Sequence, residues 1–222
     1  MTPFLLVLSS PSGGGKTTIA RQLLQARDDL AYSVSATTRP ARPGEADGVA
    51  YHFLSPEEFT RRVDAGEFLE WAEYAGNRYG TLRAEVEGII ASGRHAVLDI
   101  EVAGARQVRE RFPNSVHVFI LPPSAEALVG RLRRRATEGE GALRRRLEKA
   151  AEEVAFAAEY DYTVVNDDLV LAVEQVAAVL DAESRRVRRQ PELSRHLDDL
   201  RREIMLAARQ FGPAGSPQGV NG

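Results

Sequence analysis

A chain of 222 residues can bury a sizeable core, and we interpret it as one α/β domain with attachments. Its net charge of −3 excludes a global basic field for nucleic acid or acidic membranes, and its lack of cysteine excludes disulfides, thiolate catalysis and cysteine-based metal sites. No basic segment opens the chain and no apolar run could span a bilayer, so the expected compartment is the cytoplasm.

The first predicted elements are a buried strand and a helix joined by a glycine-rich turn. Phe4–Leu8 is an unbroken apolar run typical of a strand buried on both faces, and Thr18–Arg27 has the apolar spacing of a helix. The turn between them reads Ser10-Pro11-Ser12-Gly13-Gly14-Gly15-Lys16-Thr17. Such a turn gathers backbone N–H groups at the positive end of the helix dipole. Lys16 can then reach outer phosphates, and the Thr17 hydroxyl can ligate Mg²⁺.

This turn looks like a Walker A loop in which Ser10 replaces the usual first glycine. A flexible linker is the alternative, but a linker does not sit between a buried strand and an amphipathic helix. Only Lys16 and Lys149 among the 29 basic residues are lysines. A compact charge on a flexible stem suits a phosphate better than a planar guanidinium does. We therefore expect the loop to bind a nucleoside triphosphate.

The next stretch runs from a short strand into a basic loop. Alternating apolar side chains predict a strand over Tyr32–Ala36. Arg39 and Arg42 follow it, three residues apart, with Tyr51 shortly after. Two guanidiniums at this spacing could hold a phosphate through bidentate hydrogen bonds, and a solvated basic loop is the alternative.

Residues 35–82 depart from the alternation of strands and helices around them. We expect strands at Val49–Leu54 and Glu67–Tyr74, a helix that starts at Ser55-Pro56-Glu57-Glu58, and turns at Gly76-Asn77 and Tyr79-Gly80-Thr81. These short elements predict an inserted subdomain.

Another predicted strand carries acidic residues at its carboxyl end. After a helix over Arg83–Ser92, the strand His95–Glu101 ends in Asp99 and Glu101. Two positions apart on one strand, these side chains would face the same way. Carboxylates on one face need partners, which could be Mg²⁺ near the triphosphate or a base that carries donors.

The rest of the domain continues the α/β pattern. We expect helices over Ala103–Arg111, after Ser124 and over Leu169–Ala182, and strands over Val116–Leu121 and Tyr162–Asn166. The segment Ala136–Gly141 separates a helix with Arg131 and Arg135 from a helix with Arg146. It is interpreted as a lid over phosphate, with an exposed charged hairpin as the alternative.

In this order, the motifs resemble those of the guanylate kinases over residues 3–183. The matching stretches are Ser10–Thr17, Ser33–Arg39 with Arg42, Gly48–Phe53, Phe68–Ala72, Tyr79–Thr81, Leu98–Glu101 and Val164–Asp168. The resemblance implies a P-loop NTPase three-layer α/β core with a parallel sheet, an inserted small α+β subdomain that binds the nucleoside monophosphate, and a helical lid. It divides the chain into a core of residues 3–34, 83–123 and 151–183, an insert of residues 35–82 and a lid of residues 124–150.

The implied reaction transfers the γ-phosphoryl group of ATP to GMP, giving ADP and GDP, with Mg²⁺ accompanying ATP. The GMP phosphate would be held by Arg39, Arg42, Tyr51 and Tyr79, and guanine would be read by Ser35, Glu70, Thr81 and Glu101, with Asp99 nearby. ATP would be bound by Ser10, Pro11, Ser12, Gly13, Gly14, Gly15, Lys16, Thr17, Thr18, Arg131 and Asn166. Catalytic charge would come from Lys16, Arg135 and Arg146, and Thr17 would ligate Mg²⁺.

Departures from the family pattern and competing functions are few. Ser10 replaces glycine, Ala103 stands where glutamine is common, and Glu101 replaces the commoner aspartate. A kinase for a related small molecule, such as a ribose bisphosphate, would share the phosphate loop but would not need a guanine-reading set. A non-catalytic scaffold module of this family would have lost the lysine of the loop.

Residues 184–222 lie beyond the resemblance and are predicted to be a helical, partly disordered extension. Arg185–Arg189 would extend the last core helix as a basic patch. An apolar stripe then repeats at spacings of four and three at Leu193, Leu197, Leu200, Ile204, Ala207 and Phe211. We expect the stripe to pack on the chain's own core or to form a homodimer, and Gly212–Gly222 to be disordered.

Overall fold

The computed structural model describes residues 2–74, 76–135 and 140–210, except for the side chains of Arg135 and Gln210. This part of the chain divides into two compact units, one of residues 3–183 and one that combines the chain start with residues 184 onward. Most of the predicted lid loop and all of Gly212–Gly222 lie outside the described residues. Among the helices described, none has both the length and the apolarity that a membrane crossing requires.

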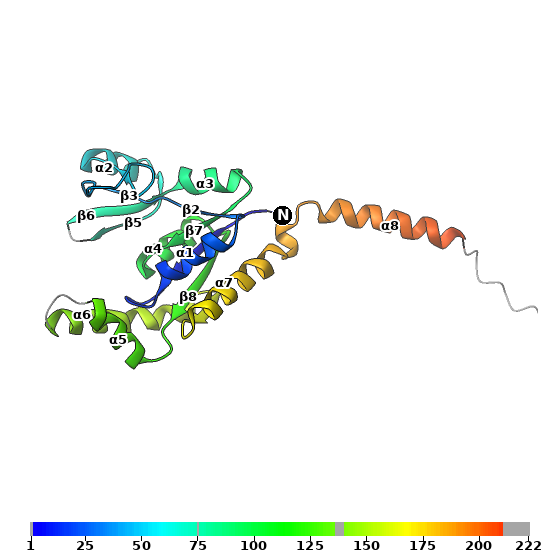
Figure 1. The fold of residues 1–222 in the computed structure, drawn as a ribbon. Coiled ribbons are helices and arrows are strands. Elements are labelled where there is room, and N and C mark those ends of the chain that lie inside the picture. Colours follow the sequence, from blue (N-terminus) through cyan, green and yellow to red (C-terminus); the bar gives the residue numbers. More distant parts are fainter. Residues whose placement is uncertain (1, 75, 136–139, 211–222) are drawn as a thin grey trace, which may run out of the picture. The chain divides into compact units, whose positions relative to one another are not determined.

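A parallel sheet forms the centre of the unit of residues 3–183 (Figure 1). Its strand order is β2-β7-β1-β8-β9, with β1 Leu5–Ser9, β2 Leu30–Tyr32, β7 His95–Asp99, β8 Ser115–Leu121 and β9 Tyr162–Val165. β1 pairs in parallel with β7 on one side and with β8 on the other. The carboxyl ends of β1 and β7 therefore lie side by side, and their following loops meet at one edge of the sheet.

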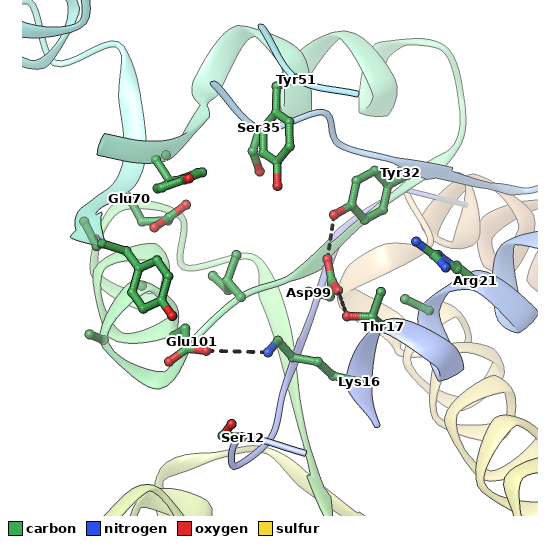
Figure 2. Close-up of a pocket in the computed structure, with 18 of the residues that line it drawn as sticks. Ser12, Lys16, Thr17, Arg21, Tyr32, Ser35, Tyr51, Glu70, Asp99 and Glu101 are labelled. Atoms are coloured by element: carbon green, nitrogen blue, oxygen red, sulfur yellow. Dashed lines mark hydrogen bonds and ion pairs between the residues drawn. The ribbon is translucent and has the colours of Figure 1, made fainter. Parts of the chain in front are cut away.

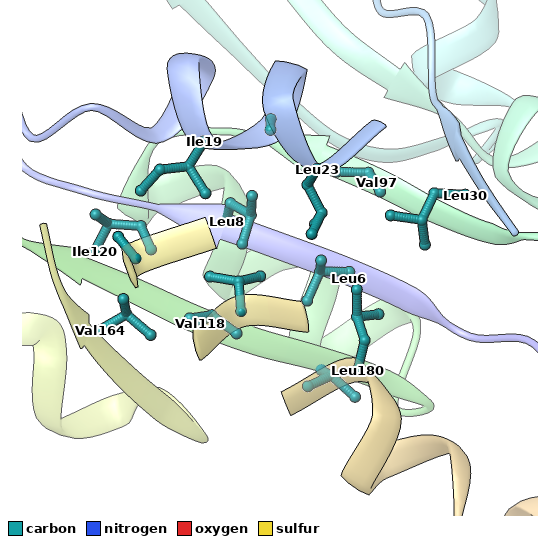
Figure 3. Packing of buried hydrophobic residues seen from close by; sticks show 14 of the residues in the cluster. Leu6, Leu8, Ile19, Leu23, Leu30, Val97, Val118, Ile120, Val164 and Leu180 are labelled. Carbon is teal, nitrogen blue, oxygen red and sulfur yellow. The ribbon is translucent and has the colours of Figure 1, made fainter. Parts of the chain in front are cut away.

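Helices cover both faces of this sheet because its inner strands bury alternate side chains in opposite directions. Leu6 and Leu8 pack with Ile19 of α1 (Lys16–Ala26) and Leu180 of α7 (Leu169–Ser184) (Figure 3). Leu5 and Val7 pack on the other face, in the cluster that includes side chains of α3 (Arg83–Ala91) and α4 (Val102–Arg111). The predicted three-layer α/β core is confirmed.

A second, smaller sheet is built from residues 36–82. Its order is β4-β3-β6-β5, with β3 Ala36–Thr37, β4 His52–Phe53, β5 Phe68–Tyr74 and β6 Asn77–Leu82. Helix α2 (Pro56–Asp64) begins as predicted, with Ser55 accepting a hydrogen bond from the Glu58 N–H at 3.1 Å. Phe59 of α2 stacks on Phe68 with ring centroids 4.4 Å apart, which fixes the helix on the sheet.

The remaining elements are the helices between β8 and β9 and the helix of the second unit. α5 (Ala125–Arg135) is capped by Ser124, whose hydroxyl accepts from the Ala127 N–H at 3.1 Å. α6 (Glu140–Ala155) leads into a short 3-10 helix, Phe156–Glu159. In the second unit, α8 spans Leu193–Gln210, and Leu197, Leu200 and Ile204 of the predicted stripe are exposed. Packing of this stripe on the core or in a homodimer stays a prediction.

Several local predictions are wrong. Tyr32–Ala36 is not one strand, because β2 ends at Tyr32 in the main sheet and β3 begins at Ala36 in the small one. Tyr79–Thr81 is not a turn but part of β6, which pairs antiparallel with β5. Arg185–Arg189 does not extend the last core helix, since α7 ends at Ser184 and a 3-10 turn over Val187–Arg189 follows. The predicted boundaries of core, insert and lid stay a prediction.

His117 of β8 gives the fold a pH-dependent term. It is 1% exposed, and burial together with the charge of Arg109 lowers its pKa from 6.5 to about 4. The ring is therefore neutral in the folded protein, and its ring nitrogen lies 2.8 Å from the Ser115 hydroxyl. The pKa of His117 is lower in the folded protein than in the unfolded chain. Its contribution to the free energy of unfolding is therefore fully present above pH 6.5 and is lost as the pH falls toward 4.

We expect the free energy of unfolding to fall by roughly 3 kcal/mol more in the wild type than in His117→Gln over this pH range. Denaturant titrations of both proteins at several pH values from 7 down to about 4 measure the difference. Parallel curves for the two proteins would contradict a buried neutral histidine. His196→Gln, on the exposed face of α8, is the matched control and should follow the wild type.

Candidate active site

The loop between β1 and α1 uses glycine where a side chain would collide with its surroundings. Gly15 is the N-cap of α1 with φ of +104°, and a Cβ there would lie 2.3 Å from the side-chain nitrogen of Asn166. A Cβ on Gly14 would lie 2.6 Å from the Cβ of Ser10. Ser10 is buried, and its hydroxyl donates to the carbonyl of Pro11 at 3.0 Å. The loop is thus closely packed on both sides.

Two side chains from distant segments hold the back of the loop. Asn166 donates its side-chain N–H to the Gly14 carbonyl at 2.9 Å. Arg131 of α5 donates to the same carbonyl at 3.3 Å and to the Asn166 carbonyl at 2.7 Å. A recess of about 390 Å³ lies here, and its lining includes Thr18, Arg131 and Asn166. The structure therefore brings these three predicted ATP-binding residues together beside the loop.

On the other side of the loop lies a larger cavity of about 1090 Å³ (Figure 2). It is lined from both sheets and from α6. The predicted site residues along it are Ser12, Gly13, Lys16, Thr17, Ser35, Tyr51, Glu70, Tyr79, Asp99, Glu101 and Arg146. One cavity therefore joins the phosphate loop to side chains of the small sheet.

Asp99 links the loop to the end of β7. Its carboxylate accepts hydrogen bonds from the Thr17 hydroxyl at 2.6 Å and from the Tyr32 hydroxyl at 2.5 Å (Figure 2). Burial of the phenol and the nearby carboxylate raise the pKa of Tyr32, so the hydroxyl keeps its proton and donates. Thr17 and Asp99 are hard oxygen donors side by side, which suits Mg²⁺ bound with nucleotide phosphates. Within the described ranges there is no cluster of three or more His, Cys, Asp or Glu residues fit for a metal.

Glu101 is not on the strand with Asp99, which corrects the prediction. β7 ends at Asp99, and Glu101 is the extended N-cap residue of α4. It still faces the cavity, where its carboxylate lies 3.7 Å from the Lys16 ammonium and 2.6 Å from that of Lys149. Partial burial opposes ionisation, but the hydrogen bond from Lys149 and the charge of Lys16 hold the pKa of Glu101 below its ordinary value.

Glu70 is a buried carboxylate on β5 at the far wall of the cavity. It is 6% exposed and accepts a hydrogen bond from the Thr81 hydroxyl at 2.7 Å. Burial raises its pKa despite this bond. Helix α4 approaches closely, since a Cβ on Gly104 would lie 2.7 Å from a Glu70 oxygen. A ligand with N–H donors would provide the partners that this carboxylate needs in a buried place.

The basic loop and the tyrosines form a third group of predicted residues. Arg39 forms an ion pair with Glu45 at 2.9 Å, and its guanidinium lies 5.4 Å from the ring centroid of Tyr51. Tyr51 and Tyr79 meet edge to face with centroids 6.0 Å apart. Arg42 has an exposed side chain and donates its backbone N–H to Glu45 at 2.8 Å. Arg39, Tyr51 and Tyr79 are therefore together, and Arg42 is beside them in the loop.

The sequence analysis assigned no site role to Tyr32, Glu45, Lys149 or Glu153. Lys149 had one signal, because it is the only lysine besides Lys16 in an arginine-rich chain. Glu153 follows it by one helical turn, but nothing in the sequence connects it to the loop. The side chain of Arg135 lies outside the described part of the chain. No contact tests the roles assigned to the site residues, and these stay predictions.

Comparison with known proteins places the whole arrangement in one family. The model of the family described as guanylate kinase matches residues 3–183. A guanylate kinase from Desulfitobacterium hafniense is 48% identical over 84% of this chain and 94% of its own. One from Symbiobacterium thermophilum is 52% identical over 82% of this chain and 86% of its own. A crystal structure of guanylate kinase from Anaplasma phagocytophilum covers 89% of this chain and 95% of its own, with a TM-score of 0.70 and 36% identity.

The packing around Gly15 predicts the effect of adding one methyl group there. We expect Gly15→Ala to lose at least about 2 kcal/mol of folding stability, because alanine is strained at the φ of +104° that the loop requires and its Cβ would collide with Asn166. MgATP binding should weaken in parallel. Gly88→Ala is the control, since a Cβ at this position of α3 meets nothing within 4 Å. Thermal unfolding and calorimetry measure both effects, and equal behaviour of the two variants would contradict the close packing.

Proposed function

The chain belongs to the guanylate kinase family of nucleoside monophosphate kinases, and we propose that it transfers the γ-phosphoryl group of ATP to GMP, giving ADP and GDP. One observation carries the proposal: a single cavity is lined both by Lys16 of the phosphate loop and by the buried Glu70 of the small sheet. A phosphoryl donor and a purine acceptor can therefore meet in one space.

Guanine suits the far wall of the cavity chemically. It offers N–H donors at N1 and N2 and an acceptor at O6. Glu70 would accept from the donors, and Thr81 would share the contact while holding the carboxylate in place. Adenine has no donor at N1 or N2 and would leave Glu70 buried and poorly paired, which typically costs a site several kcal/mol. Ser35 and Glu101 also line the cavity and would complete the guanine-reading set, with Asp99 nearby.

The GMP phosphate would be held by the group around Arg39. Tyr51 and Tyr79 line the cavity next to Arg39, and Arg42 lies in the same loop. Glu45 keeps the Arg39 guanidinium against the Tyr51 ring, which orients it before a ligand arrives. A guanidinium and phenol hydroxyls donate hydrogen bonds in the geometry that phosphate oxygens accept.

ATP would lie along the loop, with its phosphates at the backbone N–H groups and Lys16 and with its base toward Arg131 and Asn166. Thr17 and Asp99 would hold Mg²⁺, which supplies positive charge to the phosphates when bound. Arg146 faces the cavity from α6 and would neutralise charge on the transferred group. Arg135 is proposed for the same role from its sequence match.

The chemistry needs alignment and charge rather than a strong base. The GMP phosphate is already a competent nucleophile, so the protein holds it in line with the γ-phosphate of ATP. Lys16 and the arginines then offset the charge that develops on the moving group. Because the cavity spans both sheets, the two substrates are held by separate walls of one site.

Nucleotide selectivity tests the proposal directly. Purified protein with MgATP should release ADP rapidly with GMP and at least about a hundredfold more slowly with AMP, because adenine cannot satisfy Glu70. CMP, UMP, dTMP and ribose bisphosphate complete the panel, and a coupled ADP assay measures all of them. Equal rates with AMP and GMP would refute the guanine pocket. Activity with ribose bisphosphate alone would indicate the related sugar kinase instead.

Removal of the loop lysine separates the two substrates. Lys16→Ala should lose turnover by at least about a hundredfold, because the ammonium meets the outer phosphates of ATP. GMP binding, measured by calorimetry, should largely survive since the small sheet is unchanged. Arg94→Ala, an exposed cation outside the cavity, is the control and should keep full activity. Full activity in Lys16→Ala would rule out the assignment of the loop.

A further inference from the structure

A carboxylate from α6 reaches the outer turn of the phosphate loop. The Glu153 carboxylate accepts a hydrogen bond from the backbone N–H of Ser12 at 3.0 Å. Glu153 is 5% exposed, whereas Glu152 beside it faces solvent. The contact joins residues 141 positions apart in the chain. It is therefore a tertiary contact between a helix and the loop, not a local turn.

Charged side chains continue this contact around the loop. Lys149, one turn earlier on α6, lies 3.4 Å from the Glu153 carboxylate and 2.6 Å from that of Glu101. Glu101 in turn lies 3.7 Å from the ammonium of Lys16. Acidic and basic groups thus alternate along a path from Ser12 back to Lys16. The path connects the outer turn of the loop with the residue at its helical end.

The position of Glu153 is fixed by packing. Ala150 is buried with Leu128 and Leu132 of α5, and Leu147 of α6 packs against the same cluster. Leu132 also closes on the loop, since a Cβ on Gly13 would lie 3.0 Å from it. Glu153 follows Ala150 by three residues and points to Ser12 as a consequence of this packing. Burial raises the pKa of Glu153, so its hydrogen bond from Ser12 and its proximity to Lys149 are what favour the charged form.

We propose that Glu153 is a positioning residue for the phosphate chain of a nucleoside di- or triphosphate, holding the outer turn of the loop through the Ser12 N–H. The inference rests on the proposed function and extends it to a residue of α6. A loop N–H that is held in place keeps the neighbouring N–H groups aimed at one point, so less conformational freedom is lost when phosphate binds. For this role, it matters more that the side-chain oxygen can reach the Ser12 N–H than that it is charged.

Three substitutions at Glu153 separate reach from charge. Glu153→Gln keeps an oxygen at the same reach and removes the charge, whereas Glu153→Asp keeps the charge and withdraws the oxygen by one methylene. Glu153→Ala removes both. Glu152→Ala is the matched control on the exposed face of the same helix. Calorimetry with MgADP on the full chain measures binding without any reaction, and thermal unfolding of each variant checks that it is folded.

We expect Glu153→Asp and Glu153→Ala to bind MgADP about tenfold more weakly, with the KM for ATP raised in proportion and the KM for GMP unchanged. Glu153→Gln should stay within about threefold of the wild type, and Glu152→Ala should match it. Should Glu153→Ala not fold, the comparison of Glu153→Gln with Glu153→Asp still decides.

Wild-type binding in Glu153→Asp, tighter binding in Glu153→Ala, or an equal loss in Glu153→Gln and Glu153→Asp would each overturn the inference. Equal weakening of ATP and GMP would also overturn it, because a general structural defect affects both. MgADP binding is independent of the acceptor. A wild type that binds MgADP but does not phosphorylate GMP would therefore refute the proposed function and leave this test intact.

Discussion

Close contact between the glycine backbone of the phosphate loop and the side chains packed on it is the constraint on which the site depends. A Cβ on Gly14 would collide with Ser10, and a Cβ on Gly15 would collide with Asn166, so neither position has room for a side chain. The packing leaves the loop few alternative shapes, so its N–H groups are arranged before a phosphate arrives. Serine at position 10 fits this arrangement because it is buried and bonded within the loop.

The parallel order of the main sheet explains why acidic and basic groups meet at this loop. β1 and β7 are neighbours, so the segments that follow them, with Lys16 and Thr17 on one and Asp99 and Glu101 on the other, meet at one edge. Each carboxylate then has a hydroxyl or ammonium partner within the chain. The small sheet adds Glu70 from across the cavity. Side chains from both sheets thus line one cavity.

Local signals in the sequence predicted most of the fold. The features that were missed depend on contacts between residues far apart in the chain. The apolar run of β1 and the Ser55 cap of α2 depend on neighbouring residues, and both were predicted correctly. The break between β2 and β3 was missed, because the alternation of Tyr32–Ala36 continues across the change of sheet. β6 looked like a turn because Gly80 weakens its pattern, whereas pairing with β5 makes it a strand. The contact of Glu153 with Ser12 has no local signal at all.

The two lysines beside Glu101 can be used as probes. Lys16 and Lys149 are the only lysines in the sequence, and both lie against this one carboxylate. Every side-chain amine of the protein therefore sits at the site. A reagent that acylates amines, or an isotope introduced through lysine, would report on the site alone apart from the amino terminus. Because the other basic residues are arginines, lysine can serve as a chemical or spectroscopic probe at the place where ligands are expected to bind.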